Sequence, residues 1–338
     1  MHVAVDAHNV LTDRRGIGVY LRAVLRRMLA SGECRITLLL RHPLPGLKKR
    51  ALAAELGSED FALASRVPRD AAVAWHPWNG TFFGGGRRNV VTMHDVAPFV
   101  YPAADRQKRR SQQAPFESSA RTADRIIADS HFSKSGIESY LGVEPERITV
   151  VPLAADERFT PGKPEELPAP LRDRRYVLYV GTLEERKNVA TLIAAWRNAL
   201  APRGIALAAV SGGDRLPDGV VALRDLAPGR FRDIYRGALC LAFPTLYEGF
   251  GLPALEAMAC GTPAAVSRVA SLPEVCGEAA WYVDEPQSVP AWEAALLDIA
   301  SSEELRADLS RRGLEQAAKF SWDATARATL DALVEAGA

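Results

Sequence analysis

Residues 239–263 read Leu-Cys-Leu-Ala-Phe-Pro-Thr-Leu-Tyr-Glu-Gly-Phe-Gly-Leu-Pro-Ala-Leu-Glu-Ala-Met-Ala-Cys-Gly-Thr-Pro. The first five, Leu239–Phe243, have the length and apolar character of a buried parallel strand. Gly249 and Gly251 then allow a loop with unusual backbone angles. Pro253 suits the first turn of a following helix, where its missing N–H costs little. A strand, a loop and a helix in this order form the repeating unit of a doubly wound α/β sheet.

The same alternation extends in both directions from this stretch. Short apolar runs that predict further buried strands lie at Val3–Val5, Ile36–Leu40, Val73–Trp75, Val90–Met93, Ile126–Ala128, Tyr176–Val180, Ile205–Val210 and Pro263–Val266. Stretches with helical character lie between several of them, at Val19–Leu29 and Phe132–Leu141, for example. The sequence therefore predicts an α/β protein built on parallel sheets.

One segment interrupts the alternation. Residues 160–170 contain four prolines in eleven positions, which excludes a helix or a central strand. We interpret this segment as a linker between a domain of residues 1–160 and a second domain of residues 171–320. Ser321 is a favourable N-cap for a final helix, Trp322–Val334, within residues 321–338. Two open α/β sheets in tandem are expected to place ligands at the carboxyl ends of their strands.

The bulk composition excludes several classes of protein. The chain has 338 residues, 48% hydrophobic and 25% charged, with a net charge of +1, which is globular and names no nucleic-acid partner. Four scattered cysteines form no CxxC pair, so we expect reduced thiols in a cytoplasmic protein. No apolar run reaches the roughly 20 residues of a transmembrane helix. Residues 1–160 carry 23 Lys and Arg against 17 Asp and Glu. This excess could face an anionic acceptor or a membrane surface, although ordinary surface variation is the more common cause.

Two carboxylates flank the expected helix start in the opening stretch. Glu248 lies on the loop and Glu256 about one turn into the helix, so the two can reach different parts of one ligand at the helix N-terminus. Taken alone, two glutamates eight positions apart are as compatible with a glycine-rich turn bearing solvated side chains.

The whole stretch of residues 244–263 resembles the signature of the retaining family-four glycosyltransferases. The resemblance continues through Ser271-Leu-Pro-Glu-Val275, Phe320-Ser-Trp322 and Asp129-Ser-His-Phe-Ser133, and so spans nearly the whole chain. It implies a GT-B fold, in which two Rossmann-like domains face a central cleft. It further implies an acceptor-side first domain, a nucleotide-sugar-binding second domain and a last helix that crosses back to the first domain.

The resemblance also assigns roles to the two glutamates. It implies that Glu248 contacts the donor sugar and Glu256 the ribose hydroxyls of the nucleotide. The remaining donor-binding positions that it implies in this segment are Gly249, Phe250, Gly251 and Leu252.

A basic pair follows the first strand of the second domain. Arg186 and Lys187 end the string Gly181-Thr-Leu-Glu-Glu-Arg-Lys, where they could hold a diphosphate and stabilise its charge as it departs, or could be part of a solvated turn. The segment is similar to the family's phosphate loop. Thr182 stands where some members of the family carry an arginine that could contact phosphate. The expected phosphate contacts therefore depend more on Arg186 and Lys187.

Further candidates follow strands of the first domain. Gly16 and Gly18 lie in an expected loop before the helix that begins near Val19; a plain turn is the alternative, but the resemblance implies a border of the donor site. His94 ends a strand, and the resemblance implies that it lies near the reacting sugar, although a lone histidine is more often structural. Asp95 could orient its imidazole.

Two acceptor-side candidates are less specific. Trp75, like Trp78, could stack on a sugar ring or could simply pack in the core. Ser130 could face the ligand or cap the next helix.

The expected reaction is transfer of a hexosyl group from a nucleotide sugar to a hydroxyl of a glycan or lipid-linked acceptor. The family resemblance implies retention at the anomeric carbon, no required metal and no cofactor other than the donor, and the chain has no Asp-x-Asp motif. The residue pattern of positions 181–188 resembles that of mannosyl- and rhamnosyltransferase-like members. This resemblance mildly favours GDP-mannose over UDP-sugars as the donor. The expected setting is polysaccharide biosynthesis at the inner face of the membrane. A sugar phosphorylase, a sugar-nucleotide epimerase and a binding protein without activity are the alternatives.

Overall fold

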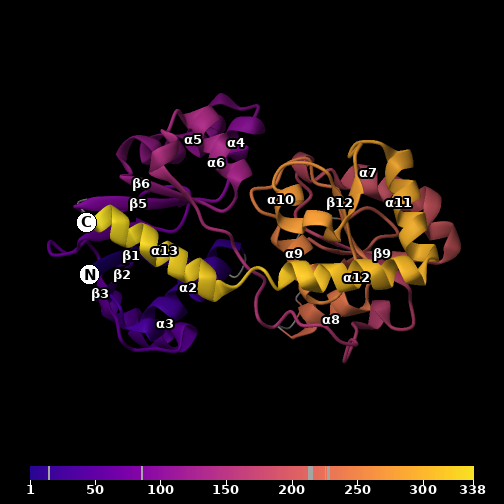
Figure 1. Ribbon diagram of the computed structural model, residues 1–338, viewed down its shortest axis with the longest axis horizontal. Helices are drawn as coiled ribbons and strands as arrows, with labels where there is room; N and C mark the ends of the chain where they lie inside the picture. The colour runs from indigo at the N-terminus through magenta and orange to yellow at the C-terminus, as the bar shows by residue number, and fades with distance from the viewer. Residues whose placement is uncertain (14–15, 85–86, 212–215, 225, 227–228) are drawn as a thin grey trace. The chain divides into compact units, whose positions relative to one another are not determined.

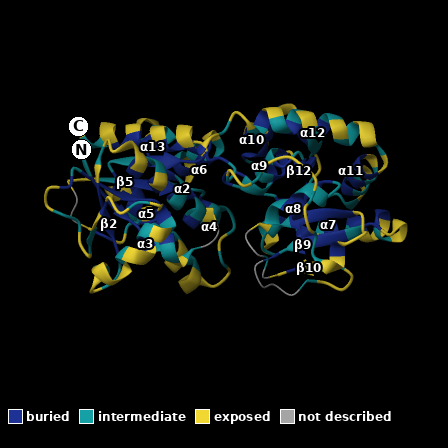
Figure 2. Ribbon diagram, turned by 90° about the horizontal axis from the view of Figure 1, so that it is seen from below, coloured by how far each residue is buried: buried dark blue, intermediate teal, exposed yellow. Residues whose placement is uncertain are grey.

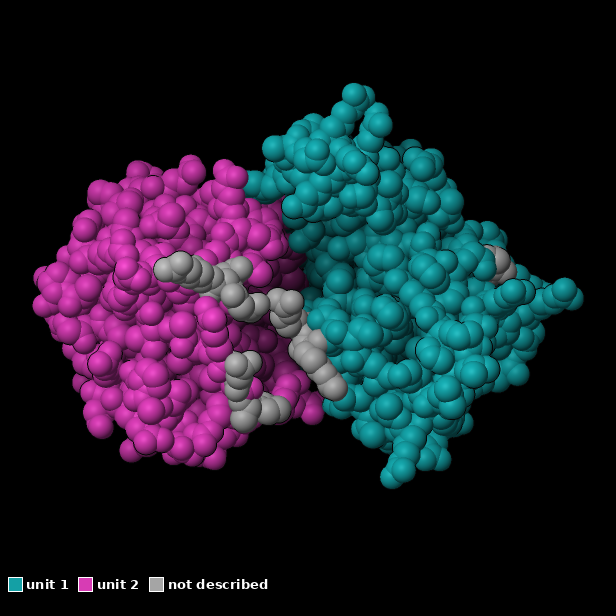
Figure 3. Space-filling model, turned by 180° about the vertical axis from the view of Figure 1, so that it is seen from behind, with its two compact units in different colours: residues 1–153, 321–338 teal, residues 154–320 magenta. Residues whose placement is uncertain are grey.

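The computed structural model describes residues 1–338 except 14–15, 85–86, 212–215, 225 and 227–228. The described chain forms two compact units. Unit 1 contains residues 1–153 and 321–338, and unit 2 contains residues 154–320 (Figure 3). Each unit has its own parallel sheet.

Unit 1 is built on a seven-stranded sheet with the order β3-β2-β1-β4-β5-β6-β7, in which every pair of neighbours is parallel. Its strands are β1 (His2–Asp6), β2 (Arg35–Leu39), β3 (Ala62–Ala64), β4 (Val73–His76), β5 (Arg88–Met93), β6 (Arg125–Ala128) and β7 (Ile148–Val150). The chain runs outward from β1 to β3 and then returns to add β4 on the other side of β1. The strand order therefore reverses between β1 and β4.

Helices flank this sheet (Figure 1). They are α1 (His8–Thr12), α2 (Gly16–Ser31), η1 (Pro45–Lys48), α3 (Lys49–Leu56), α4 (Ala97–Val100), α5 (Arg106–Thr122), α6 (His131–Leu141), η2 (Pro145–Arg147) and α13 (Trp322–Gly337). The last of them, α13, packs against α2 and over β4, β5 and β6. It begins at the predicted cap, since the Ser321 side chain accepts a hydrogen bond from the Ala324 N–H.

Unit 2 repeats the architecture with six parallel strands in the order β10-β9-β8-β11-β12-β13. The strands are β8 (Tyr176–Val180), β9 (Ala206–Val210), β10 (Val221–Leu223), β11 (Leu241–Phe243), β12 (Ala264–Ser267) and β13 (Trp281–Val283). The helices are η3 (Ala169–Leu171), η4 (Glu185–Lys187), α7 (Val189–Ala199), η5 (Ala201–Arg203), α8 (Arg230–Gly237), α9 (Leu252–Ala259), α10 (Leu272–Cys276), η6 (Gly277–Ala279), α11 (Val289–Ser301) and α12 (Glu303–Ala317). Here the strand order reverses between β8 and β11.

The central strand of unit 2 shows why its sequence is apolar throughout. Val177 and Tyr179 of β8 belong to the core on one face of the sheet, under α7 and α11. Tyr176 and Leu178 belong to the core on the other face, under α8 and α9. Both faces of this strand are buried, so both alternating sets of side chains must be apolar. Figure 2 shows the buried residues gathered in the interior of each unit.

The predicted class is confirmed, and the four strands that the sequence did not predict are instructive. They are β3, β7, β10 and β13, each three residues long, and they form the four outer edges of the two sheets. An edge strand has a neighbour on one side only and is often very short. Its signal is therefore too short to stand out against a loop.

Two local predictions are corrected. The helix expected to begin near Val19 begins at Gly16, so Gly16 and Gly18 belong to the first turn of α2 and not to a loop. A Cβ atom on Gly18 would lie 1.9 Å from the carbonyl oxygen of Asp13, so the glycine is required for close packing of the preceding chain. The proline-rich segment, residues 160–170, lies inside unit 2. No helix among the described residues is long and apolar enough to cross a membrane.

Candidate functional site

The main candidate site lies in unit 2, at the carboxyl ends of β8 and β11. These two neighbouring strands flank the point where the strand order reverses. Loops that leave such a point diverge to opposite faces of the sheet, and the crevice between them is the usual ligand site of an open α/β sheet. The loop after β8 carries Arg186 and Lys187, and the loop after β11 carries Glu248.

Backbone and side-chain hydrogen bonds fasten these two loops together. The Leu246 N–H donates to the carbonyl oxygen of Arg186 at 2.7 Å. The amide nitrogen of Asn188 donates to the carbonyl oxygens of Pro244 and Pro286, at 3.2 and 2.7 Å. Asn188 itself has a φ of 52°, the left-handed conformation that asparagine adopts more readily than most residues. The basic pair is thus held in a fixed position against the loop of Glu248.

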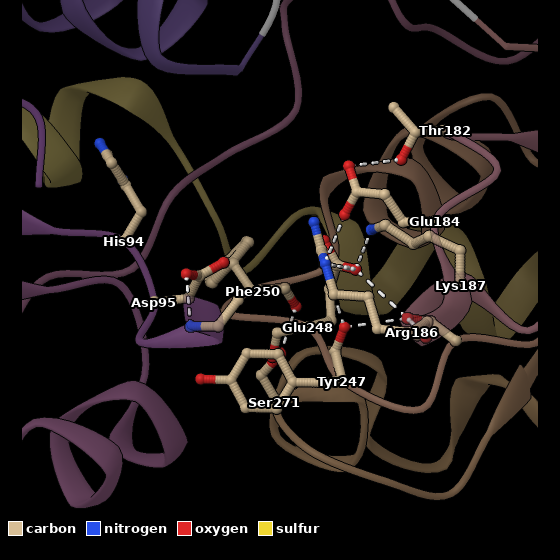
Figure 4. Close-up of polar contacts among 12 residues, drawn as sticks. His94, Asp95, Thr182, Glu184, Arg186, Lys187, Tyr247, Glu248, Phe250 and Ser271 are labelled. Carbon is tan, nitrogen blue, oxygen red and sulfur yellow. Dashed lines mark hydrogen bonds and ion pairs between the residues drawn. The ribbon is translucent and has the colours of Figure 1, made fainter. Parts of the chain in front are cut away.

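The charged side chains of the two loops meet in one cluster (Figure 4). The Lys187 ammonium forms an ion pair with Glu248 Oε2, and the Arg186 guanidinium lies 3.8 Å from the same oxygen. Arg186 also donates to Glu184, which in turn accepts from the Thr182 hydroxyl at 3.0 Å. Lys187 is buried and lies over the ring of Phe243. A buried lysine that meets a single carboxylate is well placed to exchange that partner for an anionic ligand.

The loop that carries Glu248 has a constrained backbone. The Ser271 hydroxyl donates to the carbonyl oxygens of Glu248 and Phe250, each at 2.9 Å. Gly251 has a φ of 102°, and a Cβ atom there would lie 2.7 Å from the Leu272 side chain, so only glycine fits. Helix α9 starts at the next residue, Leu252.

Among the donor-binding candidates of this loop, Phe250 has a structural role. Its ring is buried and packs edge-on against Phe320. Phe250 therefore stabilises the loop through its contact with Phe320.

Glu256 lies one turn into α9, as predicted, and is half-buried. Burial raises the pKa of its carboxyl to about 7; hydrogen bonding from Tyr235 opposes the shift, nearby Asp156 adds to it, and Arg158 opposes it. The Tyr235 hydroxyl donates to Glu256 Oε2 at 2.8 Å. Glu256 thus has a second acceptor oxygen for a ligand and changes its charge near neutral pH.

Unit 1 carries a separate polar site at the ends of β5 and β6. His94 Nδ1 lies 2.7 Å from Asp129 Oδ2, and the ring of Tyr20 packs edge-on against the imidazole. Burial alone would lower the pKa of His94, but the charge and hydrogen bond of Asp129 raise it overall. The prediction that Asp95 orients the imidazole is therefore wrong. Asp129 is the orienting carboxylate, because its Oδ2 is the atom within hydrogen-bond distance of His94 Nδ1, while Asp95 accepts from the Ala97 N–H.

The two acceptor-side candidates are interior side chains. Trp75 is fully buried, and its indole N–H donates to the Thr92 hydroxyl at 3.0 Å, so ordinary core packing describes its environment. Ser130 is also buried and caps α6 by accepting from the Ser133 N–H. Neither side chain presents a surface to a ligand.

A second cluster in unit 1 was not predicted. Asp6, Arg41, Trp78 and Phe82 surround the carboxyl ends of β1 and β4, where the strand order of this sheet reverses. The fully buried Asp6 carboxylate accepts from the Trp78 indole at 2.8 Å and from the Arg41 guanidinium at 3.0 Å. Arg41 lies over the rings of both Trp78 and Phe82, and Phe82 is 56% exposed.

This unit-1 cluster combines an exposed aromatic ring with a buried ion pair. The unit-2 cluster differs, since its carboxylate, Glu248, is partly exposed, whereas Asp6 is fully buried. Two signals in the sequence could have located the unit-1 cluster: Asp6 ends a strand, and Trp78 follows one. The contributions of Tyr235, Tyr20 and Arg41 depend on packing between distant segments, which no local pattern reports.

Comparisons with known proteins agree with this geometry. The model of the family "Glycosyl transferases group 1" matches residues 164–316, and that of "Glycosyltransferase Family 4" matches residues 13–159. The chain is 34% identical to the O-antigen chain mannosyltransferase B of Escherichia coli, over 72% of this chain and 70% of that protein. It is 29% identical to the D-inositol 3-phosphate glycosyltransferase of Saccharomonospora viridis, over 99% and 89% of the two chains.

Solved structures show the same fold. HepE of Anabaena, solved in complex with UDP and glucose, has a TM-score of 0.73 at 14% identity, over 99% of this chain and all of that one. The glycosyltransferase WaaG, involved in lipopolysaccharide biosynthesis, has a TM-score of 0.71 at 14% identity, over 98% and 99% of the two chains. The two parallel-sheet units are thus the two Rossmann-like domains of a GT-B fold. The chain belongs to the family-four glycosyltransferases, the glycosyl transferases group 1, and is a glycosyltransferase.

Proposed function

We propose that this chain transfers a hexosyl group from a nucleotide sugar to a hydroxyl of a glycan or lipid-linked acceptor, with retention at the anomeric carbon and no required metal. The observation that supports this most is the cluster of Arg186, Lys187 and Glu248 at the reversal point of the unit-2 sheet. It places two cations for a diphosphate beside one carboxylate for sugar hydroxyls, which are the two chemical parts of a nucleotide sugar.

Each residue has a role in this proposal. Arg186 and Lys187 hold the diphosphate and stabilise the charge that it gains as the bond to the anomeric carbon breaks. Glu248 accepts hydrogen bonds from the donor sugar after Lys187 turns to the phosphates. Glu256, with its free acceptor oxygen, binds the ribose hydroxyls. Replacing Glu256 by alanine should therefore weaken binding of the nucleotide itself.

Retention calls for attack from the side on which the diphosphate departs. In the proposed step, the acceptor oxygen bonds to the anomeric carbon on that side while the bond to the diphosphate breaks. The acceptor proton passes to an oxygen of the departing phosphate, so no protein nucleophile is needed. We also propose that His94, oriented by Asp129, hydrogen-bonds a hydroxyl of the reacting sugar; its raised pKa favours the donor form.

For the donor, we propose GDP-mannose ahead of UDP-sugars. The relative from Escherichia coli is named a mannosyltransferase of the O-antigen chain, which supports both the sugar and a role in polysaccharide biosynthesis. The proposed setting is the cytoplasmic side of a membrane, with peripheral contact.

The test is to incubate the purified protein with GDP-mannose, UDP-glucose and UDP-N-acetylglucosamine and to measure nucleoside diphosphate release. Mannose-terminated oligosaccharides and a bacterial lipid extract serve as acceptor sources. The proposal expects release with one donor that increases when an acceptor is added. Conversion of the donor into another nucleotide sugar without release would indicate an epimerase. Formation of a sugar phosphate from a glycan and inorganic phosphate would indicate a phosphorylase, and either result would overturn the proposal.

A further inference from the structure

The most exposed large apolar side chains of the described residues lie on one short turn of unit 1. Leu44 is 62% exposed and Leu47 is 74% exposed, and both belong to the segment between β2 and α3. Phe82 is 56% exposed and lies beside this segment, because the guanidinium carbon of Arg41 is 4.1 Å from the centre of the Phe82 ring. An apolar group of this kind on a surface is a sign of an interaction site.

The segment that carries the two leucines is held in place. The Leu47 N–H donates to the carbonyl oxygen of Leu44 at 3.2 Å, and the Leu44 N–H donates to His42 Nδ1 at 3.0 Å. The Lys49 ammonium donates to the carbonyl oxygen of Glu59 at 2.6 Å and lies over the ring of Phe61. These contacts fix the backbone of the turn, so the leucines are presented outward by a defined structure.

The charged residues within the segment that carries the leucines have one sign. Residues 41–50 contain Arg41, Lys48, Lys49 and Arg50 and no acidic residue. Arg41 and Lys49 have internal partners, whereas Lys48 and Arg50 are exposed and form no ion pair within the described part of the chain. Several arginines of unit 2 do have such partners, since Arg172, Arg230, Arg268 and Arg311 each pair with a carboxylate.

We propose that Leu44, Leu47, Phe82, Lys48 and Arg50 form a docking surface for an anionic lipid bilayer. The apolar side chains enter the boundary between headgroups and acyl chains, and the two cations meet lipid phosphates. A second copy of this chain is a poorer occupant, because a symmetric interface would bring the same cations against each other. The proposal assigns residues to the peripheral membrane contact proposed above, and it does not depend on the transfer reaction.

The docking surface also indicates where a lipid-linked acceptor would approach the protein. Phe82 belongs both to this surface and to the cluster of Asp6, Arg41 and Trp78 at the reversal point of the unit-1 sheet. A lipid-linked acceptor held in the bilayer would therefore meet the protein at the same edge of the sheet.

The experiment is co-sedimentation of the full chain with vesicles, without nucleotide or acceptor. Vesicles of phosphatidylcholine alone are compared with vesicles that also contain phosphatidylglycerol, at low and high salt. The parent protein should bind the anionic vesicles and lose binding at high salt. Lys48→Ala with Arg50→Ala should weaken that binding roughly 30-fold, since each cation near such a surface contributes about fivefold. Leu44→Ser with Leu47→Ser should weaken it by about tenfold or more.

Matched controls come from the same unit. Lys108→Ala with Arg110→Ala removes two exposed cations from α5, and Tyr140→Ser with Val334→Ser removes two exposed apolar side chains elsewhere. Both controls should bind anionic vesicles like the parent. The proposal is overturned if the parent does not bind those vesicles, or if a control lowers binding as much as its matched variant. Self-association that depends on Leu44 and Leu47, without vesicle binding, would also overturn it. All variants change exposed side chains, so thermal unfolding should match the parent.

Discussion

The two sheets of this chain reverse their strand order at corresponding places, but the side chains there differ in kind. In unit 1, the Asp6 carboxylate is fully buried and is saturated by the Trp78 indole, the Arg41 guanidinium and a backbone N–H. In unit 2, Glu248 is partly exposed and its main partner is Lys187. The first carboxylate therefore maintains structure, whereas the second can exchange its partner for a ligand.

This difference bears on the donor site that we propose for unit 2. The position alone supplies loops that diverge and a crevice between them. A charge whose partner can be replaced by substrate supplies the chemistry. Three variants test this contrast. The first is measured by the rate of sugar transfer, the second by the free energy of unfolding, and the third by how that free energy depends on pH.

The largest effect is expected from Glu248→Ala. The rate of sugar transfer should fall about 10³-fold, because the carboxylate that positions the donor sugar is lost. Nucleoside diphosphate affinity should not fall, since Lys187 is left without its carboxylate and remains available for phosphate. Transfer rates and calorimetric titrations with the diphosphate give the two readings. Glu278→Ala, an exposed glutamate elsewhere in unit 2, is the control. Unchanged turnover in Glu248→Ala would remove the basis of the donor-site assignment.

A smaller effect, on stability and not on donor binding, is expected from Asp6→Asn. The substitution leaves the guanidinium of Arg41 without its ion-pair partner, so the free energy of unfolding should fall by about 3 kcal/mol. Urea denaturation measures this change, and titration with the diphosphate checks that affinity is retained. A variant with full stability and impaired nucleotide binding would contradict the contrast between the two reversal points.

The smallest effect concerns the pH dependence of stability at Glu256. Its pKa is about 7 in the folded protein against an ordinary value of 4.5. A raised pKa means that the stabilising contribution is complete below pH 4.5 and is lost as the pH rises through about 7. Glu256→Gln does not ionise and still accepts from Tyr235. Relative to the parent, it should therefore gain about 2 kcal/mol of unfolding free energy between pH 5 and pH 8.

Urea denaturation of both proteins at the two pH values measures that difference. Parallel pH profiles for the parent and the variant would show that Glu256 ionises normally in the folded state. The parent should also remain folded at both values, because the effect is small compared with the stability of a typical domain.

Much of the fold was predictable because its signals are local. Strands buried on both faces, such as β8, must be apolar at every position, and the Ser321 cap follows from a single residue and its context. The α/β class follows from these signals, whereas the GT-B architecture was implied by the family resemblance, and both predictions are confirmed. The four edge strands could not be predicted, because a run of only three residues does not stand out from a loop even where it is apolar, as in β10 and β13.

The candidate site also has features that were predictable from the sequence and features that were not. Arg186, Lys187 and Glu248 were each predicted as site residues after a strand of the second domain, and the structure brings them together. Whether a side chain points into the core or toward a ligand was not predictable: Trp75 follows the same sequence rule and is fully buried. The partner of His94 was also misassigned, because Asp129 reaches it from a neighbouring strand while Asp95 is adjacent only in sequence.

The central claim is that the unit-2 reversal point holds the diphosphate of the donor and the unit-1 reversal point does not. The direct test is calorimetric titration of GDP and UDP into the parent, Lys187→Met and Arg41→Met, with thermal unfolding of each as a check on folding. We predict that Lys187→Met weakens binding of the preferred diphosphate by about tenfold or more and that Arg41→Met leaves it unchanged. Equal affinity in the parent and Lys187→Met, or a loss confined to Arg41→Met, would contradict the account.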